Sequence, residues 1–286
     1  MGSKRTSNWQ RVKDKWQLAV VGKSLVMENV SKVQYVATVA RSVVFQVLLY
    51  LWIIFVLTLL FPAVFFEKRF LFKIFRFLTR SALFLMKYIL RITCRFENIS
   101  LFEEVFKQHG PFIIACKHQS GFETVIFSLF FENFNIVAKE EMKKVPLIGN
   151  YMKSMDFIFI ERKAGRKAVE ILLEKGKESM QNNRPLLIFP EGSRAEFGTR
   201  GKYHVGVALL YEKLNVPVIP VALNVGAVWP KKSMIKFPGT VTIRVLPPIL
   251  PGLDKLSALQ CIEESIENAC AEIGSGRPLA PSLQRA

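Results

Sequence analysis

The amino-acid sequence predicts an α/β protein with a largely parallel central sheet flanked by helices and with an N-terminal membrane-binding helical region. From residue 96 onward, short apolar runs alternate with longer mixed segments, which is typical of parallel strands covered by helices on both faces. Residues 1–95 differ, because they carry 16 of the 40 Lys and Arg residues but only 3 of the 23 acidic residues. We therefore expect membrane-anchoring helices over 1–95, an α/β domain over 96–273 and a flexible tail over 274–286.

The composition limits the possible classes of protein. Half of the residues are hydrophobic, which excludes intrinsic disorder, and the formal net charge is +17. An apolar and basic chain favours an anionic phospholipid membrane as its partner, and we expect no nucleic-acid partner. The four cysteines show no C-x-x-C spacing and the three histidines are too few for a His-built centre, so we expect reduced structural thiols and no metal. The basic, mixed N-terminus does not have the pattern of a cleavable signal peptide.

The most apolar segment covers residues 43–66. It contains one strongly polar side chain, Gln46, and Pro62 lies near its end. About 20 apolar residues suffice to cross a bilayer, so the segment is long enough. Basic residues lie on both sides, and the positive-inside rule therefore leaves open a true span and a helix that enters and leaves through the same leaflet. Pro62 favours a bend, and a buried helix of a soluble protein is the third interpretation.

The next segment, 69–91, predicts a helix that lies in the headgroup plane of a membrane. At about 100° per residue, its six cations fall within roughly 60° of one another. We expect these cations to face phosphates while the aromatic rings on the other faces enter the acyl layer. The cations are Arg69, Lys73, Arg76, Arg80, Lys87 and Arg91, and the rings include Phe70, Phe72, Phe75, Phe77 and Phe84.

The remaining two thirds of the chain supply the strands and helices of the α/β domain. Strands are expected where runs of four to six β-branched or aromatic residues are bounded mostly by Gly, Pro or Asn. These runs are 112–116, 134–138, 157–160, 186–189, 218–223 and 241–246, and helices are expected at 164–181, 202–214 and 254–272. In such sheets, ligands bind beyond the carboxyl ends of the strands.

His118 follows the first of these strands, in the sequence Lys-His-Gln-Ser-Gly-Phe-Glu. If a helix starts near Ser120, the imidazole can fold back toward the carboxylate of Glu123, which would fix its tautomer and make it a general base. The same spacing fits a capping box, in which Glu123 binds the backbone of Ser120. Both interpretations are open at this point.

A second group of polar residues, Phe-Pro-Glu-Gly-Ser-Arg, begins at the end of the strand at 186–189. Its Pro and Gly predict a tight turn that presents Glu191, exposes the backbone amide of Gly192 and adds Arg194 as a cation for phosphate. Arg162 ends another strand shortly before a helix and could also hold an anion. An ordinary turn and a surface ion pair are the structural alternatives.

Taken in order, these elements resemble the glycerolipid acyltransferase family, and most of all its bacterial 1-acylglycerol-3-phosphate (lysophosphatidate) branch. The resemblance covers roughly residues 95–250. The family's H-x4-D block is matched by His118 and, with Glu for Asp, by Glu123, and its F-P-E-G-[ST]-R block is matched without change. The other matches are Lys139 with the Pro-x-x-Gly segment at 146–149, Arg162 after an apolar strand, and the Val-Ile-Pro-Val segment at 218–221.

The resemblance implies transfer of an acyl group from acyl-CoA or acyl carrier protein to the free hydroxyl of lysophosphatidate, forming phosphatidate for phospholipid biosynthesis. It implies that His118 is the general base, that Glu123 orients it, and that no bound cofactor, metal or protein nucleophile is needed. Lys139, Arg162 and Arg194 would bind the phosphate, Glu191 the glycerol backbone, and the amide near Gly192 another polar group. The implied location is the bacterial inner membrane, with the catalytic domain on the cytoplasmic face.

Two departures from the family pattern widen the possible functions. Glu123 is one methylene longer than the usual Asp, and lipid A acyltransferases also tend toward H-x4-E. Another acceptor, such as glycerol-3-phosphate, an ornithine lipid or a lipid A precursor, therefore stays open. Asp156 stands where the family often has Gly. Outside the family, the alternatives are an inactive membrane adaptor and a lipid hydrolase using Ser120 or Ser193, although no G-x-S-x-G elbow is present.

Overall fold

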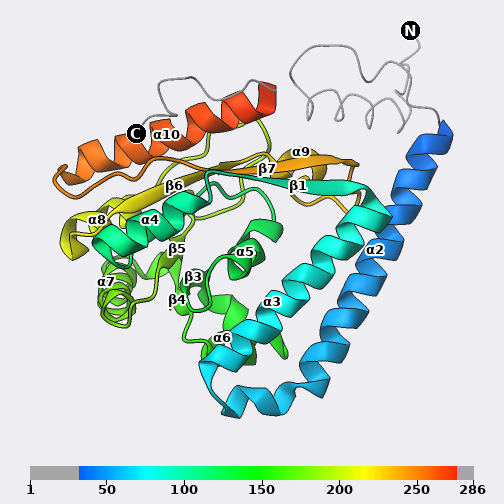
Figure 1. The fold of residues 1–286 in the computed structure, drawn as a ribbon, viewed down its shortest axis with the longest axis horizontal. Helices are drawn as coiled ribbons and strands as arrows, with labels where there is room; N and C mark the ends of the chain where they lie inside the picture. Colours follow the sequence, from blue (N-terminus) through cyan, green and yellow to red (C-terminus); the bar gives the residue numbers. More distant parts are fainter. Residues whose placement is uncertain (1–31, 276–286) are drawn as a thin grey trace, which may run out of the picture.

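The computed structural model describes residues 32–275, and its central element is a seven-stranded sheet (Figure 1). The strands lie in the spatial order β1-β7-β6-β2-β5-β3-β4. Every neighbouring pair is parallel except β6 and β7, so the prediction of a largely parallel sheet flanked by helices is confirmed. The strands are β1 (Ile92–Glu97), β2 (Ile113–Cys116), β3 (Asn135–Lys139), β4 (Ile158–Ile160), β5 (Leu186–Ile188), β6 (Val218–Leu223) and β7 (Gly239–Val245).

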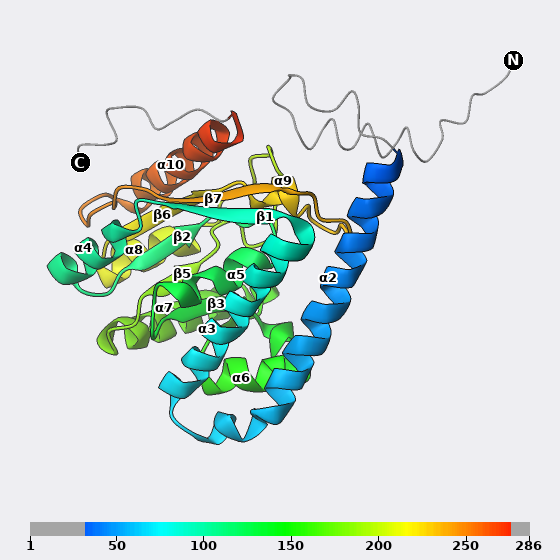
Figure 2. The same ribbon diagram turned by 45° about the vertical axis from the view of Figure 1, so that its right-hand side comes forward.

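Helices cover both faces of this sheet (Figure 2). Alternate residues of β2 belong to two separate cores. Ile113 and Ala115 pack with the helices α7, α8 and α10, whereas Ile114 and Cys116 belong to a larger cluster with α2 to α6. A strand covered on both sides can therefore be apolar at every position, as β2 is. The helices of the domain are α4 (Ser100–His109), α5 (Phe122–Ile126), α6 (Ile148–Ser154), α7 (Arg166–Gln181), α8 (Gly206–Leu214), α9 (Val225–Val228) and α10 (Lys255–Ser275).

The elements β1, α4, α6 and α9 were not predicted from the sequence. β1 is an edge strand that pairs only with β7, and Thr93 and Arg95 are exposed on it, so it lacks the apolar run that predicted the other strands. The expected domain boundary at residue 95 falls inside this strand.

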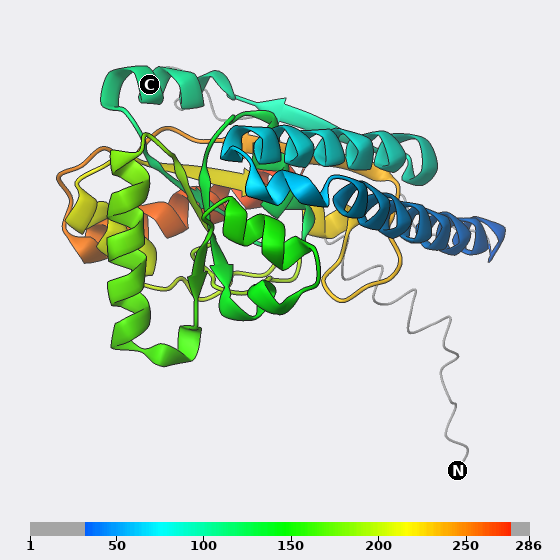
Figure 3. The same ribbon diagram turned by 90° about the horizontal axis from the view of Figure 1, so that it is seen from below.

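The N-terminal helices form a hairpin along one side of the domain (Figures 1 and 3). Helix α2 (Lys32–Leu59) begins before the predicted apolar segment 43–66 and ends before Pro62. A 3-10 helix, Phe61–Phe65, with Pro62 in its first turn, makes the predicted bend. Helix α3 (Lys68–Leu85) then runs back beside α2 and continues as a π-helical turn, Met86–Leu90.

Helix α3 docks on the α/β domain with part of its aromatic surface. Leu71, Phe72 and Ile74 are buried, and the Phe72 ring lies 5.5 Å from that of Phe134 and 6.4 Å from that of Phe157. The prediction that the aromatic rings of this helix enter the acyl layer is therefore wrong for its protein-facing side. These residues belong to one continuous core that also contains residues of β2 and β5, so the hairpin and the sheet share a single hydrophobic interior.

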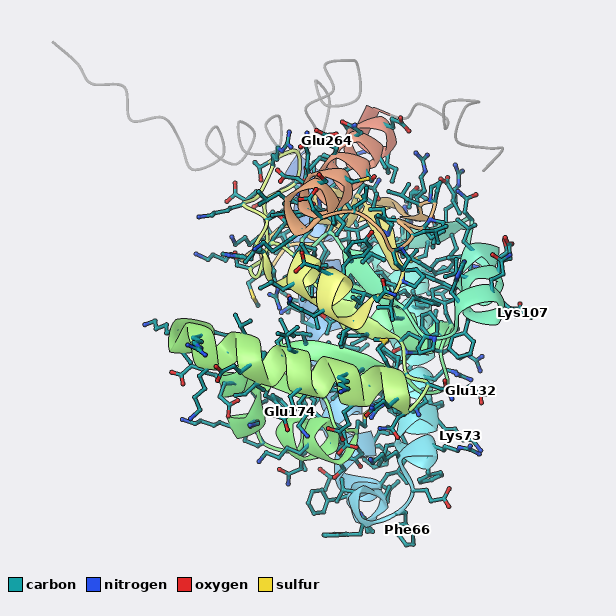
Figure 4. All side chains as sticks on the ribbon, turned by 90° about the vertical axis from the view of Figure 1, so that its left-hand side faces the viewer. Phe66, Lys73, Lys107, Glu132, Glu174 and Glu264 are labelled. Atoms are coloured by element: carbon teal, nitrogen blue, oxygen red, sulfur yellow. The ribbon has the colours of Figure 1, made fainter. Side chains whose placement is uncertain are left out.

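The exposed face of α3 carries cations and aromatic rings together rather than on separate faces. Lys73 points outward from the helix, and Phe66 extends from the turn of the hairpin (Figure 4). The exposed residues recur at spacings of three and four, namely Phe70, Lys73, Phe77, Arg80, Phe84 and Lys87. Such a stripe matches a membrane interface, where rings enter the acyl boundary and cations meet headgroups.

Helix α2 adds a long apolar surface beside this stripe. Residues Val33–Leu59 are long enough to cross a membrane, and an 18-residue window within them has a mean hydropathy of 2.4, with 33% of that window buried inside the protein. The exposed apolar side chains of the helix include Val36, Val44, Leu51, Ile54 and Phe55. These features are consistent with membrane association, and the basic residues before position 32 lie outside the described residues.

The C-terminal helix α10 extends to Ser275. The position of the predicted helix at 254–272 is confirmed. The predicted start of a flexible tail at Gly274 is too early, because Gly274 is still helical and lies near the ring of Phe197. Residues 276–286 lie outside the described part of the chain.

One cation of the predicted lipid-facing set is instead a structural residue. The side chain of Arg76 donates hydrogen bonds to the backbone carbonyls of Ser128 (2.8 Å) and Phe131 (3.1 Å). We expect Arg76→Gln to lower the free energy of unfolding by about 2 kcal/mol, because charge-assisted bonds to carbonyls are lost. Thermal unfolding in detergent measures this change.

Arg80, one turn further along α3 and exposed, is the matched control. Arg80→Gln should leave the melting temperature unchanged but weaken binding to anionic vesicles, by about 1 kcal/mol for one cation near the surface. Equal melting temperatures for the two variants would contradict the structural role of Arg76.

Candidate active site

Two loops meet at the carboxyl edge of the sheet because the strands before them are direct neighbours. β2 and β5 are parallel, with Ala115 opposite Ile188, so the chain leaves both strands side by side. The ring of His118 stacks on that of Phe189, with 4.2 Å between centroids and 23° between planes. The backbone N–H of Ala195 donates to the carbonyl of His118 at 2.7 Å and ties the loops together.

His118 and Glu123 contact each other directly. The His118 Nδ1 to Glu123 Oε1 distance is 2.9 Å, and the carboxylate is fully buried while the imidazole side chain is 14% exposed. Helix α5 begins at Phe122, so Glu123 sits in its first turn and reaches back to the loop. An ionised carboxylate can only accept hydrogen bonds, so Nδ1 carries the proton and Nε2 has a free lone pair.

The same carboxylate also holds the loop backbone. Glu123 therefore binds the backbone of Ser120, as the capping-box interpretation predicts, and also binds His118, as the general-base interpretation predicts. The backbone N–H groups of Gln119 and Ser120 donate to Oε1, and the Ser120 hydroxyl donates to Oε2 at 2.6 Å. That hydroxyl in turn accepts from the N–H of Phe122. One buried anion therefore holds the turn before α5 and orients the imidazole, which is the arrangement of a general base.

The loop after β5 forms the tight turn that its sequence predicts. Gly192 has a φ of +62°, in the left-handed region that favours glycine, and its N–H donates to the carbonyl of Phe189 at 2.9 Å. Ser193 and Arg194 on this turn are exposed. The guanidinium of Arg194 lies over Gly121 at the start of α5, where an added Cβ would be 3.3 Å from it. Arg194 therefore lies beside the His118 loop.

Glu191 is buried under the His118 loop rather than exposed on the turn. Its Oε1 accepts the backbone N–H of His118 at 2.9 Å, and its Oε2 lies 3.2 Å from Nζ of the buried Lys117. Burial raises the pKa of Glu191, and the His118 N–H and the Lys117 charge partly offset this effect. A contact between Glu191 and glycerol stays a prediction, because both carboxylate oxygens already face partners within the chain.

Lys139 and Arg162 lie further along the same edge. Lys139 is the last residue of β3 and Arg162 follows β4. These strands are two and three strands from β2, so the two backbones are about 10 Å and about 14 Å away from that of β2. The Lys139 side chain is half exposed and pairs with Glu141 at 2.9 Å. Arg162 begins a short 3-10 helix, Arg162–Ala164, and its side chain lies outside what the structure describes. Their predicted contact with phosphate stays a prediction.

The backbone conformation of Asp156 explains why the family often has glycine at this position. Its φ is +57°, a region that glycine enters freely and that Asp tolerates better than most residues. Its carboxylate pairs with Lys68 of α3 and lies 3.7 Å from the guanidinium of Arg184. The substitution thus adds a link between the hairpin and the sheet.

Two cavities adjoin the His118 loop. The first, of about 370 Å³, lies between the helical hairpin and helices α5 and α6, and is lined almost entirely by apolar side chains. The second, of about 350 Å³, is a polar hollow lined by the loop at 191–204 and by Lys231. Arg194 lines both, so it stands between an apolar space and a cationic one.

Several residues of the site gave no signal in the sequence. Gln119 accepts the N–H of Gly226 at 2.8 Å and so joins the His118 loop to the segment after β6. Lys117 is buried, although a lysine after a strand ordinarily predicts a solvent-exposed side chain. Its position directly before His118 is the one sequence feature that could have indicated a role.

The described residues contain no group of three His, Cys, Asp or Glu side chains arranged to hold a metal ion. All four cysteines are free thiols. Burial raises the pKa of Cys94 to about 11 and that of Cys270 to about 12, and it also raises the pKa of Cys116. These thiols are therefore protonated near neutral pH and poor nucleophiles.

The fold and the site together define a class of protein: an α/β domain with a His–carboxylate pair at the carboxyl edge of a mainly parallel sheet, beside an apolar cavity and a cationic loop. Residues 98–224 match the family model described as Acyltransferase. This segment is an acyltransferase-family domain, and the resemblance based on the sequence motifs is confirmed.

Individual relatives agree with this family. The chain is 37% identical over 137 residues to a 1-acyl-sn-glycerol-3-phosphate acyltransferase of Pseudomonas aeruginosa, covering 48% of this chain and 53% of that protein. It is 30% identical over 116 residues to the protein of the same name from Helicobacter pylori, covering 40% and 48%. The chain thus spans about half the length of these two curated relatives.

The fold also matches a solved structure. The crystal structure of the 1-acyl-sn-glycerophosphate (LPA) acyltransferase PlsC from Thermotoga maritima superposes with a TM-score of 0.70. The match covers 86% of this chain and 99% of that one at 21% identity, so it supports the architecture, including the helices before the sheet.

The geometry of Glu123 leads to a test that separates charge from shape. Glu123→Gln keeps the size but replaces an anion that accepts from Nδ1 of His118 and from two backbone N–H groups. We expect kcat to fall by 10² or more, about 2.7 kcal/mol, together with a lower melting temperature. Glu123→Asp keeps the charge and should retain more activity than Gln. A Gln variant with near wild-type kcat would remove Glu123 from the catalytic residues.

Proposed function

We propose that this protein is an O-acyltransferase that moves a fatty acyl group from acyl-CoA or acyl carrier protein to the free hydroxyl of 1-acylglycerol-3-phosphate. The product is phosphatidate, in phospholipid biosynthesis. The observation that carries the proposal is the buried Glu123 carboxylate on Nδ1 of His118, which leaves Nε2 free as a base at the ligand-binding edge of the sheet.

In the proposed reaction, the oxygen of the acceptor hydroxyl attacks the thioester carbonyl while Nε2 of His118 removes the proton of that hydroxyl. Glu123 stabilises the imidazolium that forms. The tetrahedral intermediate collapses with cleavage of the C–S bond, and the proton passes from the imidazolium to the leaving thiolate. General base catalysis of this kind contributes on the order of 10²–10⁴ in rate.

The apolar cavity supports a place for an acyl chain beside His118. It is lined by side chains of α2 and α3, such as Ile53, Leu57 and Leu78, and by Val125 of α5. Burial of a hydrocarbon chain there is favourable by about 0.8 kcal/mol per CH₂ group. Gly121 and Arg194 line the same cavity, so a chain inside it would reach the loop that carries His118.

The polar hollow supports a place for the phosphate of the acceptor. Arg194, Lys202 and Lys231 line it together with His204, and none of the three cations pairs with a carboxylate among the described residues. Several other cations of the domain, such as Lys117, Lys139 and Arg244, do have such partners. Unpaired cations that converge on a hollow favour a phosphate ester.

The exposed stripe of α3 and the apolar surface of α2 support a membrane location for the reaction. We infer that the protein binds an anionic phospholipid membrane through the hairpin, and that this membrane is the bacterial inner membrane with the catalytic domain on the cytoplasmic face. A lipid acceptor could then reach the apolar cavity, which the same hairpin lines, from the bilayer.

The test of the proposed function is incubation of the purified protein with lysophosphatidate and acyl-CoA. We expect phosphatidate and free thiol in equal amounts. Free fatty acid without phosphatidate would indicate a hydrolase, no turnover would indicate an adaptor, and turnover only with glycerol-3-phosphate, an ornithine lipid or a lipid A precursor would indicate another acceptor.

His118→Ala should abolish this transfer while the melting temperature and vesicle binding stay close to wild type, because the proposed role of the imidazole is proton transfer. Product formation is measured by mass spectrometry at matched protein concentration. Activity within about tenfold of wild type would contradict the assignment of His118 as general base.

The polar hollow gives a prediction on substrate affinity. Lys202→Gln combined with Lys231→Gln should raise KM for lysophosphatidate about 10-fold or more and change KM for the acyl donor little, because charge-assisted bonds to phosphate are lost. Lys213→Gln, on the surface of α8 and paired with Glu212, is the control. A larger effect on the donor than on lysophosphatidate would place the donor's phosphates in the hollow.

A further inference from the structure

Lys117 forms an ionic cluster beneath the His118 loop. Its side chain is 1% exposed, and its Nζ lies 2.6 Å from Oε1 of Glu267, 3.1 Å from the carbonyl of Thr199 and 3.2 Å from Oε2 of Glu191. Glu191 in turn accepts the backbone N–H of His118. The cluster thus leads from His118 through two buried side chains to Glu267.

Glu267 belongs to α10, 150 residues away from Lys117 along the chain and outside the segment that matches the family model. Its carboxylate also accepts a hydrogen bond from the hydroxyl of Tyr203 at 2.9 Å. The backbone at Gly201 approaches closely, because an added Cβ there would overlap the carboxylate of Glu191. The helix, the loop at 199–203 and the His118 loop are therefore packed around one lysine.

Stability alone is a poor reason for this arrangement. Removing a lysine and two carboxylates from water is expensive, and apolar side chains of similar volume often replace such buried groups without loss of stability. The two carboxylates outweigh burial and raise the pKa of Lys117, so the lysine keeps its charge. A charged cluster held directly under a proposed catalytic residue suggests a role in positioning.

We propose that Lys117 and Glu267 are positioning residues that fix the backbone of His118 through Glu191, and that α10 is consequently part of the catalytic machinery. Glu267, which accepts from the Tyr203 hydroxyl, holds the ammonium of Lys117, and the ammonium keeps Glu191 ionised and in place. Glu191 then anchors the N–H of His118. This inference rests on the proposed function, and a displacement of about 1 Å at a catalytic group can cost 10²-fold in rate.

The first test compares two glutamates one turn apart on α10. Glu267→Gln should lower kcat about 10-fold with KM for both substrates within about twofold, and Glu267→Asp, which keeps the charge, should retain more activity. Glu263, paired with Arg200 at 2.7 Å, does not contact the cluster, so Glu263→Gln is the control and should leave kcat unchanged. Equal kcat for Glu267→Gln and Glu263→Gln would overturn the proposal.

The second test is the pH profile of Lys117→Met. This variant leaves Glu191 and Glu267 without the cation. The other titratable groups that interact with them are the hydroxyl of Tyr203, the thiols of Cys116 and Cys270, and the guanidinium of Arg200. Burial already raises the pKa of Glu191, and loss of the cation raises it further, so Glu191 stays protonated to higher pH. The acid limb of kcat should move to higher pH, and part of the activity should return as pH rises.

A purely structural role would lower the melting temperature of Lys117→Met without moving the acid limb, and that outcome would overturn the proposal. If Lys117→Met fails to fold, the comparison of Glu267→Gln with Glu263→Gln decides alone. Failure of the proposed function gives a different result, because wild-type protein would then show no transfer to lysophosphatidate before any variant is made.

Discussion

The parallel pairing of β2 with β5 is the constraint on which the site depends. It places Ala115 opposite Ile188, so the loops that carry His118 and Glu191 leave the sheet next to each other. Without that register, the stacking of His118 on Phe189 and the bond from the His118 N–H to Glu191 would both be lost. The apolar strands are therefore more than a scaffold, because their register sets the distance between the proposed base and the residues that hold it.

The N-terminal hairpin is joined to the same interior. Phe72 of α3 packs on Phe134 next to β3, and Tyr151 of α6 donates a hydrogen bond to the carbonyl of Leu57 in α2 at 3.0 Å. Because one core contains both parts, the proposed membrane contact and the proposed catalysis would be mechanically connected rather than assigned to separate domains. The proposed acyl cavity follows from this union, since the hairpin supplies one wall and the α/β domain the other.

The sequence predicted those features that depend on local patterns. Short β-branched runs placed the six strands β2 to β7, and the motif around Glu191 placed a turn at the end of β5. The sequence pattern could not predict β1, because its exposed polar residues interrupt the apolar run that marks the other strands. It also could not predict that some aromatic residues of α3 face the protein and others face outward. The burial of Lys117 could also not be predicted. It depends on Glu267, whose Oε1 lies 2.6 Å from Nζ of Lys117 only in the tertiary structure. Residues that act through distant partners carry little local signal.

The length of Glu123 follows from the number of donors that its carboxylate receives. Its two oxygens accept from Nδ1 of His118, from two backbone N–H groups and from the Ser120 hydroxyl, all within the turn that precedes α5. An Asp at this position would withdraw both oxygens by about 1.5 Å, one C–C bond. The turn would then have to move toward the helix to keep the same bonds, and Glu191, Lys117 and Gln119 hold that turn from the other side. The longer side chain is thus matched to a loop whose position other parts of the fold have already fixed.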